Sequence, residues 1–169
     1  MNLLLVRHAI AEDARNPGRD ADARRALSRE GRRRMKQGAR GLRVLVPAVN
    51  LVASSPLKRA VETARLVGGA YGTEVVEEVD ALAPGAGPEP LLTWLRGHRR
   101  AGTIALVGHE PYLSSLAGLL LTGRRSSVFN FKKGGACLLE LDEPRPGSAR
   151  LDWLVTARTL RELGAGDAS

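Results

Sequence analysis

The sequence has one cysteine among its 169 residues, few aromatic side chains and no long apolar run. The single thiol, Cys137, cannot form an internal disulfide, which fits a reducing compartment, and its apolar neighbours predict a buried position. No window reaches the apolar length that a membrane span requires, and the first residues carry no basic leader. We therefore expect a soluble, cytoplasmic protein without a membrane partner.

Aromatic residues make up 4% of the chain, and this scarcity argues against nucleic-acid binding, which the net charge of +8 would otherwise favour. Single strands stack on aromatic side chains, and the sequence contains no helix-turn-helix, zinc-finger or ribonucleoprotein motif. Much of the excess charge is arginine in the stretch 15–43. It fits a solvated face, or attraction to anionic substrates and acidic partner proteins, better than it fits nucleic acid.

The chain has three histidines, and their surroundings do not suit a metal centre. No pair of histidine and aspartate lies at the i, i+3 or i+4 spacing of ligands on one helix face. His98 lies among arginines in the segment 96–100. We predict neither a metal ion nor another cofactor.

Three short apolar runs, at 3–6, 51–53 and 104–107, are predicted to be β-strands that each end in a polar turn. Pro56 and Pro111 follow the second and third runs, and proline suits the first turn of a helix. This alternation of strand and helix predicts an α/β fold with parallel strands. The carboxyl ends of such strands share one edge of the sheet, where ligands bind, so the three turns can converge on one site.

The three turns supply two arginines and two histidines. Arginine presents planar, always charged donors that match phosphate oxygens, so we predict that Arg7 and Arg59 bind a phosphoryl group. The positive surroundings favour a neutral imidazole, which can attack phosphorus, and we assign this role to His8. His109 would stabilise charge on the equatorial oxygens, and water would then hydrolyse the phosphohistidine intermediate.

The length and the pattern of elements predict a single domain over residues 1–160 and a polar tail over 161–169. Residues 10–26 lack periodicity and predict a long loop over the strand ends. A helix capped by Ser28 should follow, with its arginines opposite an apolar face. Further elements are predicted as helices over 56–70, 89–99 and 111–122, a short strand over 74–79, and paired strands over 135–141 and 150–155.

The motifs at 7–9, 54–64 and 107–111 resemble those of the histidine phosphatase (phosphoglycerate mutase-like) superfamily. The short length and the segments 25–31 and 131–135 look like its SixA-type phosphohistidine phosphatase branch. The resemblance implies a three-layer α/β/α sandwich with a mixed, mostly parallel central sheet. It also implies a metal-independent phosphatase that acts on phosphohistidine of a protein substrate.

The resemblance extends to the predicted site residues. It implies that His8 is phosphorylated in turn, that Arg7 and Arg59 bind the phosphate, and that His109 lies beside it. The family motif has glycine where this chain has Ala9, a small change that leaves the charge chemistry intact.

The general acid is a separate question, for which the resemblance points to Glu110, the residue after the second histidine. Glu110 could equally be a helix-start carboxylate, and Glu12 and Asp13 in the first loop are further candidates. Two other functions stay open: a small-molecule phosphomonoesterase of the same superfamily, and a non-catalytic module that binds phosphoryl groups or polyanions. A mutase is disfavoured because the chain lacks an extra segment to cap a small sugar phosphate.

Overall fold

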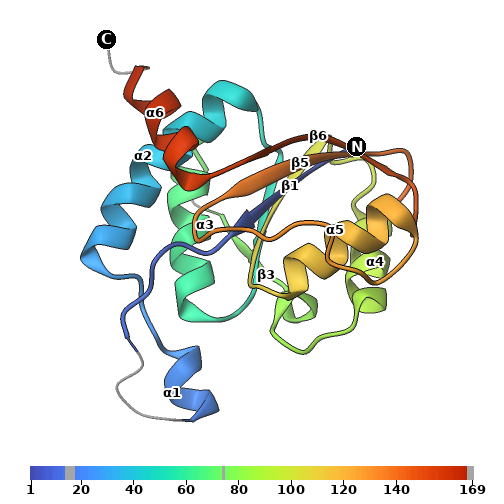
Figure 1. Ribbon diagram of the computed structural model, residues 1–169, viewed down its shortest axis with the longest axis horizontal. Coiled ribbons are helices and arrows are strands. Elements are labelled where there is room, and N and C mark those ends of the chain that lie inside the picture. The colour runs from blue at the N-terminus through green and yellow to red at the C-terminus, as the bar shows by residue number, and fades with distance from the viewer. Residues whose placement is uncertain (14–17, 74, 167–169) are drawn as a thin grey trace.

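The computed structural model describes residues 1–13, 18–73 and 75–166, which form a sheet with helices on both faces (Figure 1). The strands are β1 Asn2–Arg7, β2 Leu51–Ser54, β3 Glu77–Glu78, β4 Thr103–Gly108, β5 Ala136–Leu141 and β6 Ala149–Val155. The helices are α1 Arg19–Ala23, α2 Arg29–Leu45, α3 Lys58–Ala70, the 3-10 turn η1 Asp80–Leu82, α4 Pro88–Gly97, α5 Tyr112–Thr122 and α6 Ala157–Gly166.

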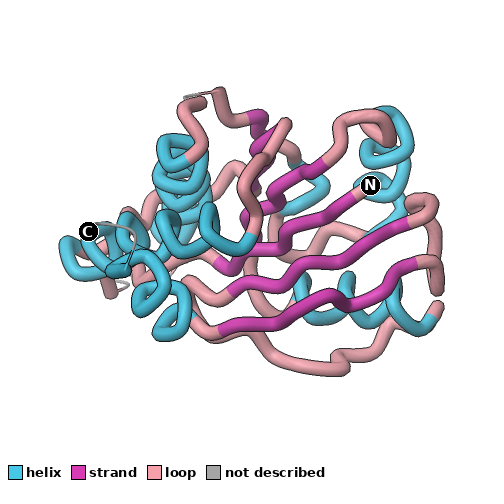
Figure 2. Tube along the Cα trace, turned by 90° about the horizontal axis from the view of Figure 1, so that it is seen from above, coloured by secondary structure: helices cyan, strands magenta, loops and turns pink. Residues whose placement is uncertain are grey.

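The sheet is mixed and mostly parallel, as predicted. Its strand order is β3-β2-β4-β1-β5-β6, and the pairs among β1 to β4 are parallel. β5 pairs antiparallel with both β1 and β6, so one edge of the sheet is a hairpin. Figure 2 shows the strands side by side, with β1 and β4 in the interior of the sheet. The order places the ends of β2, β4 and β1 next to one another.

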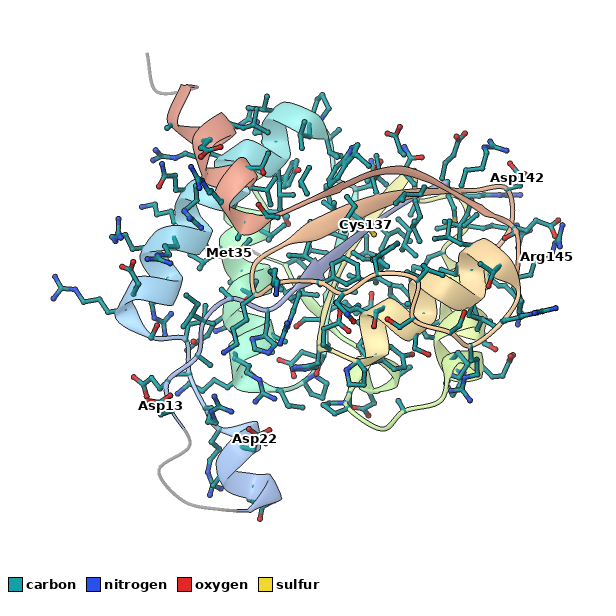
Figure 3. The ribbon with its side chains drawn as sticks, viewed as in Figure 1. Asp13, Asp22, Met35, Cys137, Asp142 and Arg145 are labelled. Atoms are coloured by element: carbon teal, nitrogen blue, oxygen red, sulfur yellow. The ribbon has the colours of Figure 1, made fainter. Side chains whose placement is uncertain are left out.

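Two apolar layers separate the sheet from its helices. Leu3 and Leu5 pack with α4 and α5 on one face, while Leu4 and Val6 pack with α2, α3 and α6 on the other. Figure 1 shows these two groups of helices on opposite sides. Cys137 is fully buried in the first layer (Figure 3). The three-layer α/β/α sandwich is therefore confirmed.

Helix α2 forms as its sequence predicts. The Ser28 hydroxyl accepts a hydrogen bond from the Gly31 N–H at 2.9 Å and so caps the first turn. Met35, Ala39 and Leu42 are buried, and the arginines lie on the opposite side of the helix. The arginine-rich stretch is thus in large part the solvated face of an amphipathic helix.

The predicted polar tail needs correction, because a helix runs through its proposed start. α6 spans Ala157–Gly166 and packs on α2 through the fully buried Leu160. A Cβ atom at Gly41 of α2 would lie 1.8 Å from the Leu160 carbonyl oxygen, so the two helices touch at backbone distance. Residues 167–169 lie outside the described part of the chain.

Several boundaries differ from the prediction. The short helix α1 interrupts the loop predicted at 10–26, part of which is outside the described residues. α3 and α5 begin at Lys58 and Tyr112, later than predicted, because the prolines precede the helices and do not occupy their first turns. α4 spans Pro88–Gly97, and β3 is only two residues long. None of the helices in the described part of the chain is long and apolar enough to cross a membrane.

Candidate active site

The ends of β1, β4 and β2 bring the predicted site residues together. Arg7 pairs with Gly108, and Ser54 pairs with Val107, so all three strands end at the same level. The His8 N–H donates to the Gly108 carbonyl oxygen at 3.0 Å, which continues the pairing into the polar turn. The convergence predicted from the apolar runs is what the sheet produces.

His8 is buried, with 7% of its surface exposed, and one of its ring nitrogens is occupied. Its Nδ1 lies 2.7 Å from the Ala9 carbonyl oxygen. Because a carbonyl oxygen only accepts hydrogen bonds, Nδ1 carries the proton and Nε2 carries the lone pair in the neutral ring. The ring centroids of His8 and His109 lie 5.1 Å apart. The neutral tautomer therefore leaves the lone pair of His8 on Nε2.

The environment keeps His8 unprotonated. The pKa of His8 is lowered to about 4, mainly by burial and also by the positive charges of Arg59, Arg7 and Lys133, against the opposing effect of the Ala9 hydrogen bond. A histidine with this pKa is a neutral imidazole at pH 7. The structure supports the neutral form that the surrounding charges predicted. Burial, however, lowers the pKa of His8 more than those charges do.

Arg59 lies in the first turn of α3, and 6% of its surface is exposed. The Thr63 hydroxyl donates to the Arg59 carbonyl oxygen at 2.7 Å and accepts from the Ala9 N–H at 3.1 Å. Thr63 thereby fixes the start of α3 against the turn after β1. The backbone of Arg59 is thus held beside the turn that carries His8.

Arg7 is anchored by the loop before β5. Its Nη1 donates to the Phe131 carbonyl oxygen at 2.6 Å. The Gly134 N–H contacts the carbonyl oxygens of Arg7 and His8 at 3.1 and 3.2 Å, so the loop wraps around the polar turn. Arg7 Nε is buried and has no hydrogen-bond partner among the described residues.

His109 is 3% exposed and is held by the turn that leads into α3. Its Nε2 lies 2.8 Å from the Ser55 hydroxyl, whereas its buried Nδ1 has no partner among the described residues. The pKa of His109 is lowered to about 3, mainly by burial and also by His8, Arg59 and Arg7, while Asp22 opposes them. The Ser55 hydroxyl therefore positions the second histidine.

Glu110 contacts the loop that anchors Arg7. One of its carboxylate oxygens accepts from the Ser114 hydroxyl at 2.6 Å, and the other accepts from the Phe131 N–H at 2.9 Å. Its assignment as general acid stays a prediction, and these contacts give it a second role in holding Phe131. Glu12 and Asp13 are exposed, and no hydrogen bond to their carboxylates is present within the described residues.

Asp22 is the residue that the sequence reasoning missed. Its carbonyl and carboxylate oxygens both accept hydrogen bonds from Arg59, at 2.7 and 3.0 Å. Figure 3 shows Asp22 on α1, away from the sheet. Nothing in the local sequence marks it, since the contact spans 37 positions and Asp22 lies in an aperiodic segment.

The arrangement is chemically that of an oxyanion site. Arg7 Nε and His109 Nδ1 are buried polar atoms without partners among the described residues, and each such atom costs about 1–3 kcal/mol unless a ligand satisfies it. Two guanidinium groups next to a neutral imidazole match a tetrahedral anion and a nucleophile. Within the described residues, no cluster of three or more His, Cys, Asp or Glu side chains is placed to hold a metal ion.

Comparisons with known proteins agree with the family resemblance of the three motifs. A family model described as the histidine phosphatase superfamily (branch 1) matches residues 3–83. An uncharacterized protein of the cyanobacterium Picosynechococcus sp. (strain PCC 7002) is 32% identical over 165 residues, which cover 96% of this chain and 93% of that protein.

Solved structures share the fold over nearly the whole chain. The protein histidine phosphatase SixA complexed with tungstate matches with a TM-score of 0.81 and 22% identity, covering 95% of this chain and 99% of that one. The alpha-ribazole phosphatase from Shigella flexneri matches with a TM-score of 0.71 and 19% identity, covering 93% and 97%.

Proposed function

Because the chain belongs to the histidine phosphatase superfamily, we propose that it is a SixA-type phosphatase that hydrolyses phosphohistidine on a protein substrate. The observation that carries this proposal is the state of His8. Its Nδ1 proton is held by the Ala9 carbonyl oxygen, and its pKa of about 4 leaves Nε2 unprotonated beside Arg7 and Arg59. A neutral, oriented imidazole next to two phosphate-binding groups is suited to phosphoryl transfer.

In the first step, His8 Nε2 attacks phosphorus in line, and the bond between phosphorus and the substrate nitrogen breaks. A substrate imidazole that is protonated on its second nitrogen leaves as neutral imidazole, so this step needs no acid from the protein. The phosphorylated His8 ring carries a positive charge, which its Nδ1–H bond to Ala9 stabilises. Arg7, Arg59 and His109 would contact the equatorial oxygens.

In the second step, water attacks the phosphoryl group, and the bond between phosphorus and His8 Nε2 breaks. Dihydrogen phosphate takes both protons of the water, and His8 returns to its neutral tautomer with Nδ1 still protonated. Neither step uses Glu110, whose carboxylate is engaged with Ser114 and Phe131. This route therefore favours leaving groups that need little acid assistance, such as phosphoramidates.

A small-molecule phosphomonoesterase is the second candidate, since structures of the same fold include the alpha-ribazole phosphatase from Shigella flexneri. The site residues suit any phosphoryl group that reaches them, so the two candidates differ in what surrounds the site. A module that only binds phosphoryl groups would keep the arginines without needing the neutral, oriented His8.

The test compares phosphate release from a histidine-phosphorylated phosphotransfer domain and from p-nitrophenyl phosphate, each measured with and without chelator. We expect release from both substrates, a higher kcat/KM for the phosphoprotein, and an acid-labile phosphoenzyme that is absent from His8→Ala. Turnover of p-nitrophenyl phosphate alone would favour the phosphomonoesterase, and turnover of neither would favour the binding module. Loss of activity in chelator would contradict metal independence.

A further inference from the structure

A groove of about 640 Å³ opens beside Arg7 and runs between α2 and α6. Its lining includes Arg7 and Ala9 of the active-site turn and Arg158 and Arg161 of α6. The groove therefore adjoins the turn that carries the phosphoryl site.

The lining of the groove combines cations with small or apolar side chains. Its charged side chains are Arg7, Arg34, Lys132, Lys133, Arg158 and Arg161, and no acidic residue lines it in the described part of the chain. The remaining lining includes Met35 and Ala157. The groove therefore offers an extended polypeptide room for its backbone and positive charge for acidic side chains.

Apart from Arg7 of the phosphoryl site, three of these cations are not neutralised by a carboxylate of the described residues. Arg34 pairs with Glu30, and Arg158 pairs with Glu162. For Lys132, Lys133 and Arg161, by contrast, no ion pair with a carboxylate occurs among the residues described. Lys132 and Lys133 are also exposed, so their charges are directed at whatever enters from solvent.

We propose that this groove binds an acidic segment of the substrate protein, next to the histidine whose phosphoryl group occupies the site at Arg7. This inference rests on the proposed phosphohistidine phosphatase function and deepens it, because it names the kind of protein surface that the enzyme selects. Aspartate or glutamate side chains flanking the phosphohistidine would contact Lys132 and Arg161. Such contacts add to substrate binding beyond the phosphoryl group, whereas a small ester does not reach them.

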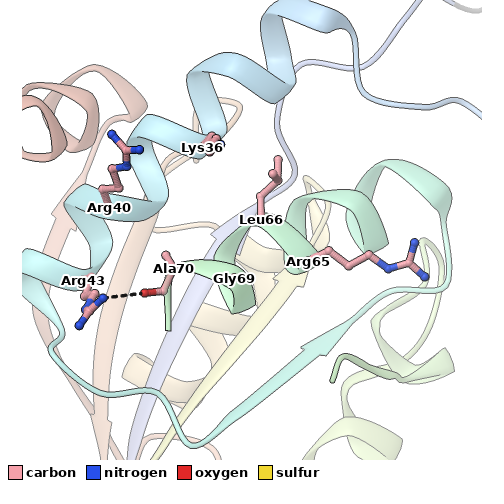
Figure 4. Close-up of a pocket in the computed structure, with 7 residues that line it drawn as sticks. All are labelled: Lys36, Arg40, Arg43, Arg65, Leu66, Gly69 and Ala70. Atoms are coloured by element: carbon pink, nitrogen blue, oxygen red, sulfur yellow. Dashed lines mark hydrogen bonds between the residues drawn. The ribbon is translucent and has the colours of Figure 1, made fainter. Parts of the chain in front are cut away.

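A second cationic groove provides a matched control. It lies between α2 and α3, measures about 630 Å³, and is lined by Lys36, Arg40, Arg43 and Arg65 without any residue of the phosphoryl site (Figure 4). Arg43 donates to the Ala70 carbonyl oxygen at 3.2 Å there. Charge reversal at Lys36 and Arg40 changes the net charge as much as reversal at Lys132 and Arg161, but in a groove separate from Arg7.

The experiment uses synthetic phosphohistidine peptides of equal length with aspartate flanks or lysine flanks, and p-nitrophenyl phosphate as the reference substrate. We expect kcat/KM for the acidic peptide to exceed that for the lysine peptide at least tenfold. The ratio of acidic-peptide to p-nitrophenyl phosphate kcat/KM should fall at least tenfold in Lys132→Glu/Arg161→Glu, mainly through KM, and stay within twofold in Lys36→Glu/Arg40→Glu. Lys132→Ala/Arg161→Ala should show a smaller fall in the same direction.

The possible failures are distinguishable. If both peptides are hydrolysed equally well, or if both double Glu variants lose the preference alike, the groove assignment is wrong while the phosphatase function stands. If neither peptide is hydrolysed but p-nitrophenyl phosphate is, the protein-substrate proposal fails. Anisotropy with a labelled, non-phosphorylated acidic peptide then tests the groove alone: binding lost in Lys132→Glu/Arg161→Glu and retained in Lys36→Glu/Arg40→Glu supports it, and any other pattern overturns it.

Discussion

Asp22 bridges Arg59 and Arg25 through its carboxylate. Arg59 donates from Nη2 at 3.0 Å and Arg25 donates from Nη1 at 2.8 Å, to different oxygens of the same group. The hydrogen bond from Arg25 and the positive charge of Arg59 lower the pKa of Asp22 below its ordinary value. A phosphoryl group that binds Arg59 must therefore compete with an anion that the protein supplies.

Removal of this competing charge should tighten anion binding. We expect Asp22→Asn to lower the inhibition constant of inorganic phosphate against p-nitrophenyl phosphate about fivefold, since a partly exposed ion pair is worth about 1 kcal/mol. Asp20→Asn, on the same helix and without a contact to Arg59 in the described structure, is the control and should leave the constant unchanged. An unchanged constant in Asp22→Asn would mean that Asp22 does not compete for the site.

The sequence predicts those parts of the site that follow from the local pattern of apolar and polar residues. β1, β2 and β4 are continuous apolar runs because both sheet faces are covered, so their ends, and with them His8 and His109, could be located without a structure. The antiparallel placement of β5 next to β1 could not be derived in this way, because apolar runs carry no information about strand order.

Asp22 and α6 escaped prediction for different physical reasons. The contact between Asp22 and Arg59 is tertiary and depends on how the first loop folds back over α3. α6 buries only Leu160 and Gly164 fully among its described residues and otherwise exposes much of its surface, so few apolar residues mark it in the sequence. Its docking depends on close backbone approach at Gly41, which a hydrophobic pattern does not record.

A variant of Glu110 can distinguish a role in positioning Phe131 from a role in proton donation. In Glu110→Ala, the Phe131 N–H loses its acceptor, whereas the Ser114 hydroxyl still has the Pro111 carbonyl oxygen, so the Phe131 contact with Arg7 should loosen. We expect kcat/KM for p-nitrophenyl phosphate to fall about fivefold, as for one lost hydrogen bond of about 1 kcal/mol.

Phenyl phosphate provides the comparison, because its poorer leaving group needs an acid more than p-nitrophenolate does. An equal loss for both esters would show that Glu110 acts only by position, and its assignment as general acid would be wrong. A much larger loss for phenyl phosphate would support the general acid.

The two buried histidines should make the protein less stable in acid. Their pKa values are about 4 for His8 and about 3 for His109, below the ordinary value of 6.5. Between pH 6.5 and pH 4, the unfolded chain therefore binds protons at positions where the native protein does not, and the free energy of unfolding falls as the pH falls. Each pKa unit corresponds to about 1.4 kcal/mol, so His8 alone accounts for roughly 3 kcal/mol between neutral pH and about pH 4.

Denaturant unfolding at neutral pH and near pH 4.5 measures this loss. The double variant His8→Gln/His109→Gln should lose less stability on acidification than the natural sequence does, by more than about 1 kcal/mol, because glutamine does not titrate. The pH dependence of the free energy of unfolding that remains in the double variant is due to all other titratable groups. Equal losses in both proteins would show that the two imidazoles are not the acid-sensitive groups.

Because α2 and α6 are in close contact, we expect one added methyl group to lower the free energy of unfolding strongly. Alanine at Gly41 would place its Cβ atom 1.8 Å from the Leu160 carbonyl oxygen, a backbone atom that cannot move unless α6 shifts. We expect Gly41→Ala to lower the free energy of unfolding by about 3 kcal/mol, the upper range for overpacking, as measured by denaturant titration. Gly69→Ala in α3, where a Cβ atom meets nothing within 4 Å, should instead stabilise the protein by about 0.5–1 kcal/mol. If Gly41→Ala were as stable as Gly69→Ala, α6 would not be docked on α2 at this distance in solution.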